Sequence, residues 1–177
     1  MKLKLAYYGS KWLRKRAKEI DAITPEIREL AAAMIDLMNQ CKGVGIAANQ
    51  VERDLRIFIT KCPFYNQEDE WIEGETLVYI NPKIISHSDE LVIFDDGCLS
   101  IPGVYRDHPR PKHIQIEALD LEGQLIKKEL SDFEAFNFMH ELDHLNGVLF
   151  IDRLDQRARK KLKPQLQEIK KKYSSST

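Results

Sequence analysis

Residues 140–144 read His-Glu-Leu-Asp-His, and this pentapeptide constrains the fold more than any other part of the sequence. Positions four apart share one face of an α-helix, so His140 and His144 can present two imidazole nitrogens to one metal ion. Glu141 stands beside that face, where its carboxylate can act on a water molecule without binding the metal. We therefore expect a helix that faces a metal site. The alternative is a solvated helix with two surface histidines.

Two histidines leave a catalytic metal site one protein ligand short. Metzincins use a third histidine downstream, but Phe150 occupies that position here, and neither His nor Cys follows His144. The downstream carboxylates that could replace it are Asp152, Asp155 and Glu168. The upstream candidates are Cys41, Cys62, Cys98, His87, His108 and His113. The upstream set is favoured, because the downstream acids lie just past the helix or in a basic tail.

Cys98 is the preferred third ligand. It follows Asp96 and Gly97 and precedes Leu99 and Ser100, between two apolar stretches. Gly97 lets the backbone approach another group closely, and a thiolate binds borderline metals strongly. The alternative for a single cysteine is a small buried hydrophobic residue.

A third motif, Gly-Val-Gly-Ile-Ala-Ala-Asn-Gln, occupies residues 43–50 after a predicted helix. That helix begins at Thr24 as the N-cap, with Pro25 in its first turn, and we expect Gly43 to end it. A glycine-rich loop can present bare backbone groups to a peptide-like ligand. Gln50 closes the motif with an amide that can donate to a developing oxyanion. The alternative is an ordinary helix end followed by a turn.

Further sequence signals outline the elements around these motifs. Ser131–Glu134 has the pattern of a capping box that starts the second helix, and Gly147 stands where that helix would stop. The predicted strands are Leu55–Thr60, Leu77–Ile80, Leu91–Phe94, Ile114–Leu119 and Leu125–Leu130. Asp120–Gly123 indicates a hairpin turn, and residues 62–76 a loop. Strands in succession followed by a helix favour the α+β class.

The composition is that of a globular domain. The 177 residues are 43% hydrophobic and 31% charged, with a net charge of −1, so we expect one catalytic domain over residues 1–177. Three cysteines do not suggest a disulfide framework. We find no secretory signal and no apolar run of membrane-spanning length. The cytoplasm is the expected compartment, and neither membrane nor direct DNA binding is expected.

Taken together, the three motifs resemble those of the peptide deformylase family, in order and in approximate spacing. The segments that carry the resemblance are 43–50, 97–100 and 140–147. The resemblance implies an α+β fold, in which antiparallel β-sheets pack around a central metal-binding helix, with a C-terminal helix. It also implies a metal-dependent hydrolase that removes the N-formyl group from the N-terminal methionine of newly synthesised peptides.

The resemblance assigns a role to each candidate residue. Cys98, His140 and His144 would hold one divalent metal ion, while Glu141 acts as the general base. The Gln50 amide and the Leu99 backbone N–H would stabilise the oxyanion. Residues expected to contact the N-formylmethionyl substrate are Gly45 and Ile46, through their backbones, and Gly97, Phe136 and Asn137. The family implies Fe²⁺ in the cell, and the ligand set also suits Zn²⁺, Ni²⁺ or Co²⁺.

The sequence departs from the family pattern at four positions. Asp96 stands where Glu is usual, Asn49 where Pro is common, and Met139 where Gln usually precedes the first histidine. Asn137 is a polar residue on the expected substrate side. These departures leave open a catalytically impaired, deformylase-like protein with a structural metal. A metalloprotease of the H-E-x-x-H type is a weaker alternative, disfavoured by Phe150.

The C-terminal segment is strongly basic. Nine Lys or Arg residues and three acidic residues give residues 152–177 a charge of +6. We expect residues 155–177 to form a basic helix or tail, broken near Pro164, with 174–177 unstructured. One interpretation is an electrostatic contact with the ribosome. The other is a structural helix whose apolar residues pack on the domain, namely Leu154, Leu162, Leu166 and Ile169.

Overall fold

The computed structural model describes residues 1–174 of the chain. Its α-helices are α1 (Pro25–Gln40), α2 (Asp132–Leu145) and α3 (Gln156–Ser174), and its 3₁₀ turns are η1 (Lys11–Arg14), η2 (Ala48–Val51) and η3 (Phe150–Arg153). Its strands are β1 (Gly45–Ala47), β2 (Ile57–Lys61), β3 (Phe64–Tyr65), β4 (Trp71–Ile72), β5 (Thr76–His87), β6 (Leu91–Cys98), β7 (Ile101–Pro111), β8 (His113–Leu119) and β9 (Leu125–Ser131).

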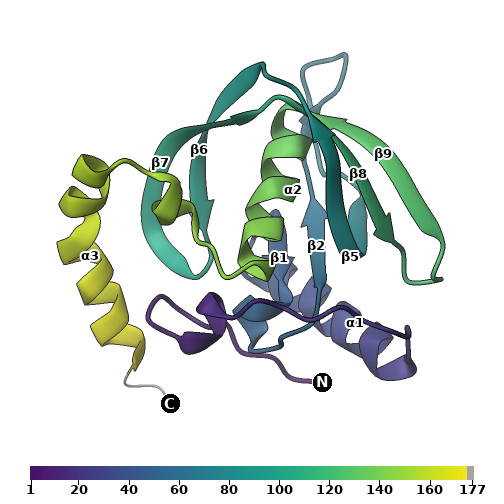
Figure 1. Cartoon of the computed structure of the whole chain (residues 1–177), viewed down its shortest axis with the longest axis horizontal. Helices are drawn as coiled ribbons and strands as arrows, with labels where there is room; N and C mark the ends of the chain where they lie inside the picture. Colours follow the sequence, from purple (N-terminus) through teal and green to yellow (C-terminus); the bar gives the residue numbers. More distant parts are fainter. Residues whose placement is uncertain (175–177) are drawn as a thin grey trace.

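The strands form one larger sheet and two two-stranded ribbons. The larger sheet has the order β1-β2-β5-β8-β9 with antiparallel neighbours, and β6 pairs with β7 as a separate antiparallel ribbon. Figure 1 shows α2 between the sheet and this ribbon, with α1 below and α3 at the side. The predicted α+β architecture with a central helix and a C-terminal helix is confirmed.

Apolar side chains on two faces explain why α2 is central. Phe138 packs edge-on against Phe58 and Tyr79 of the sheet, with ring centroids 4.9 Å and 5.1 Å away. On the other face, Phe136 meets Phe94 of β6 at 5.3 Å. A helix that is apolar around most of its circumference is stable only when it is buried. The metal motif is thereby carried into the interior.

The two ends of α2 form differently from each other. Gly147 has φ +74°, its N–H bonds to His144 O at 3.0 Å, and Val148 N–H bonds to Asp143 O at 2.9 Å. This is the Schellman arrangement, so the predicted stop is confirmed. The predicted capping box is wrong, because the Ser131 side chain makes no cap hydrogen bond. Ser131 ends β9 opposite His113, and the extended backbone of the sheet sets the entry to the helix instead.

Helix α1 starts at Pro25 as predicted, but Gly43 does not end it. The left-handed residue is Lys42, with φ +54°. Lys42 N–H bonds to Asn39 O at 3.0 Å and Gly43 N–H bonds to Met38 O at 2.9 Å, which is a Schellman motif placed one residue earlier. Gly43 instead allows the backbone to pass close to the Leu99 side chain, since a Cβ at this position would lie 2.8 Å from Leu99 Cδ1.

The five predicted strands and the hairpin turn between β8 and β9 are present, but other strands were missed. Residues 62–76 contain the small β3–β4 pair, and the glycine motif contains β1. Strand β7 was missed because it contains prolines, which weaken a strand prediction. Pro109 and Pro111 pair with Ile93 and Leu91 in a two-stranded ribbon, where missing backbone donors are tolerated.

The C-terminal segment is a helix that packs on the domain. Asp155 caps α3 by accepting a hydrogen bond from Ala158 N at 2.8 Å. Leu162, Leu166 and Ile169 are buried in one apolar cluster with Ile101 and Phe150, among others. The predicted break at Pro164 is wrong, because the helix runs through it, with Pro164 on the exposed side. Of the expectation for 174–177, Ser174 belongs to α3, and residues 175–177 lie outside the described part.

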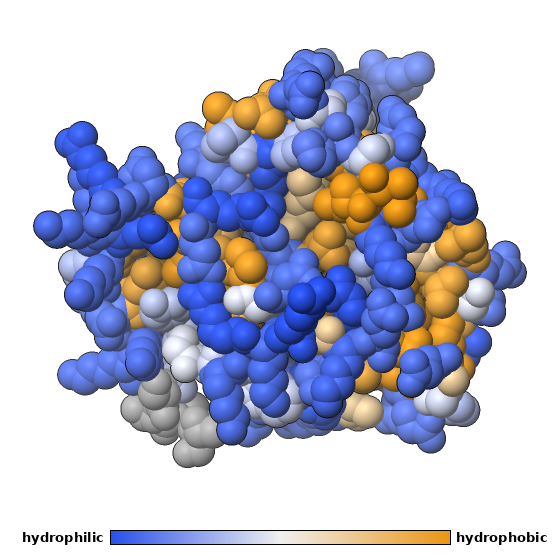
Figure 2. Space-filling view, viewed as in Figure 1, coloured by the Kyte–Doolittle hydropathy of each residue, from blue (hydrophilic) through white to orange (hydrophobic). Residues whose placement is uncertain are grey.

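The surface of α3 that faces away from this cluster is basic. Lys160, Lys161 and Lys163 are exposed. Figure 2 shows hydrophilic side chains projecting from the α3 side of the molecule. Within residues 1–174, none of the helices has the length and apolar character needed to cross a membrane.

Candidate metal centre and active site

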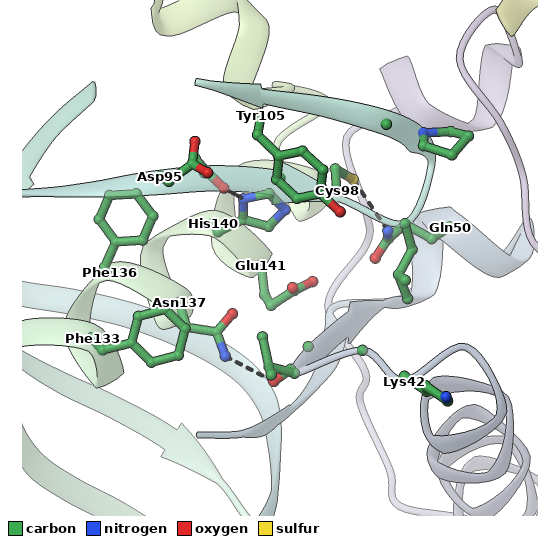
Figure 3. Close-up of a pocket in the computed structure, with 18 residues that line it drawn as sticks. Lys42, Gln50, Asp95, Cys98, Tyr105, Phe133, Phe136, Asn137, His140 and Glu141 are labelled. Carbon is green, nitrogen blue, oxygen red and sulfur yellow. Dashed lines mark hydrogen bonds and ion pairs between the residues drawn. The ribbon is translucent and has the colours of Figure 1, made fainter. Parts of the chain in front are cut away.

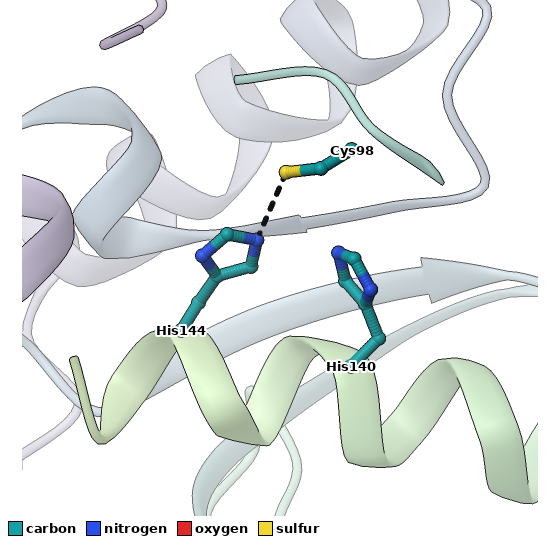
Figure 4. Close-up of side chains that lie close together, drawn as sticks. All are labelled: Cys98, His140 and His144. Atoms are coloured by element: carbon teal, nitrogen blue, oxygen red, sulfur yellow. Dashed lines mark hydrogen bonds between the residues drawn. The ribbon is translucent and has the colours of Figure 1, made fainter. Parts of the chain in front are cut away.

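The structure brings Cys98, His140 and His144 together. Their ligand atoms all lie within 4.8 Å of one another, and Cys98 Sγ is 3.2 Å from His144 Nε2. Both imidazoles project from α2 toward the thiol at the end of β6, as Figure 4 shows. Among the described residues, this is the only group of three or more His, Cys, Asp or Glu side chains that could hold a metal ion.

The other predicted ligand candidates lie outside this group. Cys62 Sγ accepts a hydrogen bond from Asn137 at 3.2 Å, and Cys41 stands at the end of α1. Asp152 pairs with Arg14 and accepts from Leu149 N at 2.8 Å. His108 contacts the carboxylate of Asp96 at 2.7 Å. Cys98, the candidate preferred above, is the one that lies beside both histidines.

The residues fit a divalent metal ion. Asp96 Oδ1 lies 2.7 Å from His140 Nδ1, which fixes the tautomer and leaves Nε2 free for a metal. Burial lowers the pKa of His140, but the charge and hydrogen bond of Asp96 outweigh it and raise that pKa well above its ordinary value. Burial and the charge of His140 lower the pKa of His144 well below its ordinary value. Without a metal ion the site thus favours a charged His140 beside a neutral His144, and a metal ion at Nε2 of His140 would take the place of that proton.

Glu141 is a buried carboxylate without a full set of partners. Its Oε2 has no hydrogen-bond partner in the structure, and Oε1 lies against the backbone of Gly45. Burial raises the pKa of Glu141 to about 7. Figure 3 shows its side chain in the cavity, between Gln50 and Asn137. A carboxylate with a pKa near neutrality is suited to accept and return a proton.

Gln50 is held so that its NH₂ group faces the metal centre. Its Oε1 accepts a hydrogen bond from Ala47 N at 2.8 Å, which orients the amide. Its Nε2 lies 3.2 Å from Ser100 Oγ and 3.5 Å from Cys98 Sγ. The donor side of the amide therefore lies beside the Cys98 thiol, where it can donate to a group bound in the cavity.

A cavity of about 350 Å³ opens over these groups. It is lined by Lys42, Gly43, Val44, Gly45, Gln50, Asp95, Asp96, Gly97, Cys98, Leu99, Pro102, Gly103, Tyr105, Phe133, Phe136, Asn137, His140 and Glu141. The Asn137 amide donates to Val44 O at 2.8 Å and so ties α2 to the segment before β1. Tyr105 lies across Gly97, where a Cβ would come within 2.5 Å of its ring.

Of the predicted substrate contacts, the structure does not bring Ile46 to the cavity. Its side chain is fully buried in the apolar cluster between α1 and the larger sheet. Lys61 N–H bonds to Val44 O at 2.8 Å, and antiparallel bonding alternates, so Ile46 directs its backbone groups toward β2. Gly45 therefore directs its backbone N–H and C=O groups away from β2. Because β1 is at the end of the strand order, the Gly45 backbone faces an edge where an extended peptide can add.

The sequence did not predict an ionic network beside these residues, buried at Arg110, Asp96 and Asp143 and exposed at Arg153. Arg110 contacts Asp96 at 3.3 Å and Asp143 at 2.8 Å, and Arg153 contacts Asp143 from the other side. Asp143 lies inside the His-Glu-Leu-Asp-His motif, which was the one available signal. The partners could not be found from the sequence because the register between β6 and β7 decides which side chains meet.

A helix with two histidines four residues apart, a cysteine beside both and a buried glutamate form the arrangement typical of a metallohydrolase. The family model described as polypeptide deformylase matches residues 2–160. The chain belongs to the polypeptide deformylase family. It is 42% identical over 167 residues to the peptide deformylase of Borreliella burgdorferi, covering 94% of this chain and 96% of the relative.

Two further comparisons agree. The chain is 38% identical over 175 residues to peptide deformylase 1B, chloroplastic/mitochondrial, of Arabidopsis thaliana, covering 99% of this chain but 62% of that relative's length. The crystal structure of peptide deformylase from Ehrlichia chaffeensis has a TM-score of 0.88 to it and 30% sequence identity, with 99% of both chains covered.

Proposed function

We propose that this chain is a metal-dependent peptide deformylase, which removes the formyl group from the N-terminal methionine of newly synthesised peptides. The observation that carries the proposal is the arrangement around one cavity, where Cys98, His140, the buried Glu141 and the oriented Gln50 amide line the wall and His144 lies beside the first two. We also propose one catalytic domain over residues 1–177, acting in the cytoplasm, with residues 155–177 as its basic C-terminal helix.

Cys98, His140 and His144 would hold the metal ion. When bound, a divalent ion there polarises the formyl carbonyl and makes water more acidic. Glu141 accepts the proton of the attacking water and then delivers it to the leaving amine, which releases formate and the free N-terminus. Its unpartnered Oε2 is the group available for this proton transfer.

Two donors would stabilise the charge that develops on the formyl oxygen. The Gln50 NH₂ group stands beside Cys98 and is fixed by the bond from Ala47 N–H to its oxygen. The Leu99 backbone N–H is the second proposed donor, in the segment directly after Cys98. Donors that are already oriented stabilise the transition state without reorganisation.

The substrate would lie along β1 with its methionine side chain in the cavity. The Gly45 backbone faces the open edge of the sheet, whereas Ile46 contributes to the core beneath it. Phe136 and Gly97, with Phe133 and Tyr105, supply apolar walls. The close approach of Gly45 and Glu141 leaves little space beside the reacting carbon, so we propose that formyl is accepted and the larger acetyl group is excluded.

The alternatives receive less support. A protein with a merely structural metal needs no buried carboxylate left without a partner, as Glu141 is. A metalloprotease must also accommodate residues on both sides of the scissile bond. Release of formate from formyl-Met-Ala-Ser, measured with the metal protected from oxidation, tests the function. Cleavage of an internal peptide bond without formate release would contradict it.

We propose Fe²⁺ as the metal in the cell, with Zn²⁺, Ni²⁺ and Co²⁺ as ions that the same ligands accept. Metal analysis of protein purified without oxygen tests this identity. Cys98→Ser, His140→Ala and His144→Ala should each lose metal and activity together. Stoichiometric metal in Cys98→Ser with full turnover would contradict the proposed ligand set.

A second partner is proposed for α3. Lys160, Lys161 and Lys163 are exposed on the surface that faces away from the core, and such a charge row suits a polyanion. Because the substrate is a nascent chain, we propose the ribosome as this partner.

A further inference from the structure

Asp96, the carboxylate behind His140, uses both of its oxygens. Asp96 Oδ1 contacts His140 Nδ1 at 2.7 Å, and Oδ2 contacts His108 Nε2 at 2.7 Å. Arg110 Nη2 reaches the same Oδ2 at 3.3 Å. All four side chains are buried, so this cluster is shielded from solvent.

His108 is placed by the register of the β6–β7 ribbon. It pairs with Phe94, two residues before Asp96, and alternation puts all three side chains on the face toward α2. The His108 ring packs against Phe136 at 5.4 Å between centroids. Since an ionised carboxylate only accepts, His108 Nε2 carries the proton of the bond to Asp96. His108 does not line the cavity.

His108 contacts the Asp96 carboxylate more closely than Arg110 does. Its contact with Oδ2 is shorter than that of Arg110, which is shared with Asp143 through a bond of 2.8 Å. Aspartate is one methylene shorter than glutamate, so its carboxylate reaches less far from β6. A donor on the neighbouring strand can fix the shorter acid where it still meets His140.

We propose that His108 and Asp96 are a matched pair, in which His108 is a positioning residue that holds the shorter carboxylate against the metal ligand His140. The inference rests on the metal site proposed above and not on the identity of the substrate. The alternative is that His108 only packs against Phe136 and does not position Asp96.

The test is a double-variant cycle in the full-length protein. Zinc affinity is measured by competition with a chelator for wild type, His108→Leu, Asp96→Glu and the double variant. Loss of an outer hydrogen-bond partner costs about 10–100-fold in metal affinity, and we expect that loss in His108→Leu. Asp96→Glu alone should also bind zinc more weakly, because its extra methylene crowds His108.

The double variant should recover zinc affinity to within a few-fold of wild type, because the longer acid no longer needs the histidine. His108→Gln, which keeps an N–H donor, should lose less than His108→Leu. Losses that multiply in the double variant, or unchanged affinity in His108→Leu, would overturn the proposal. If His108→Leu does not fold, a folded double variant decides: near-normal affinity supports the pairing and a large loss refutes it.

Formate release is measured in parallel. Because His108 does not line the cavity, KM at saturating zinc should stay unchanged in His108→Leu. If wild type binds zinc through Cys98, His140 and His144 but releases no formate, the proposed function fails, and the affinity cycle still tests the pairing.

Discussion

Gly45 lies so close to Glu141 that a Cβ atom at position 45 would come within 2.2 Å of Glu141 Oε1. The strand edge proposed to bind the peptide is thus in contact with the proposed base. This approach has no room for a side chain, and its nearest obstacle is the carboxylate itself. The identity of residue 45 is therefore tied to the position of the base.

Gly45→Ala should lower kcat by about 10²-fold or more, because the added methyl displaces the Glu141 carboxylate from the attacking water. Metal content should stay stoichiometric, since no ligand is touched. The matched control is the same change in a Glu141→Gln background, where it should cause little further loss. A full additional loss there would mean that Gly45 acts on the substrate independently of the base.

Glu141→Gln should keep its metal and lose about 10²–10⁴-fold in rate, the usual scale of general acid–base catalysis. Glutamine preserves the volume of the buried side chain but cannot accept the proton. Formate release by metal-loaded protein and metal analysis of the same sample provide the measurement. Turnover near that of wild type would eliminate Glu141 as the base.

The raised pKa of Glu141 predicts a pH-dependent stability in the chelated, metal-free protein. Burial moves this pKa from 4.5 to about 7, so the folded state binds the proton more tightly than the unfolded state between these values. The contribution of Glu141 to stability is therefore full below pH 4.5 and declines as pH rises through 7. Urea unfolding at about pH 5 and about pH 7.5 checks this. Glu141→Gln should remove this part of the slope; an unchanged slope would mean that other groups produce it.

Gln50→Ala should lower kcat by about 10²–10³-fold, as for the loss of one oxyanion donor. Alanine also removes the acceptor for Ala47 N–H, so it can loosen β1. Gln50→Glu keeps an acceptor for Ala47 N–H and loses the NH₂ donor but adds a carboxylate beside Cys98, so the two variants are compared. A change confined to KM in both variants would mean that Gln50 binds substrate without stabilising the transition state.

The sequence was most informative where chemistry fixes the spacing. The interval between His140 and His144 predicts a helix and a metal at once, and Gly147 ends that helix by the backbone conformation expected of glycine. The start of α2 was not predictable in the same way. Ser131 is paired in the sheet opposite His113, and this tertiary contact overrides the local capping pattern.

The outer residues of the site depend on strand register, which the sequence does not state. His108 was a plausible ligand on residue type alone, and only its pairing with Phe94 turns it toward Asp96. Arg110 lies in the same proline-containing strand, whose composition argued against a strand. The roles of such residues follow from neighbours that are distant in sequence.

The C-terminal helix α3 has a buried apolar face and an exposed basic face, and separate variants can test each face. Leu162 is buried with 1% of its surface exposed, so Leu162→Ala should destabilise the protein by about 2–5 kcal/mol. Because Cys98 packs against the same cluster, metal content should fall near the melting temperature. Truncation after Leu154 should have a larger effect of the same kind. Thermal melts with metal analysis check both variants.

Changing Lys160, Lys161 and Lys163 to Gln should leave the melting temperature within a few degrees, since these side chains are exposed. The same triple variant should weaken co-sedimentation with ribosomes at low salt. For wild type, co-sedimentation should fall as salt rises, because exposed charges are screened and counterions are released. Leu162→Ala, tested well below its melting temperature, is the control that keeps the charge. Equal ribosome binding by wild type and the triple variant would mean that the basic surface only solvates a structural helix.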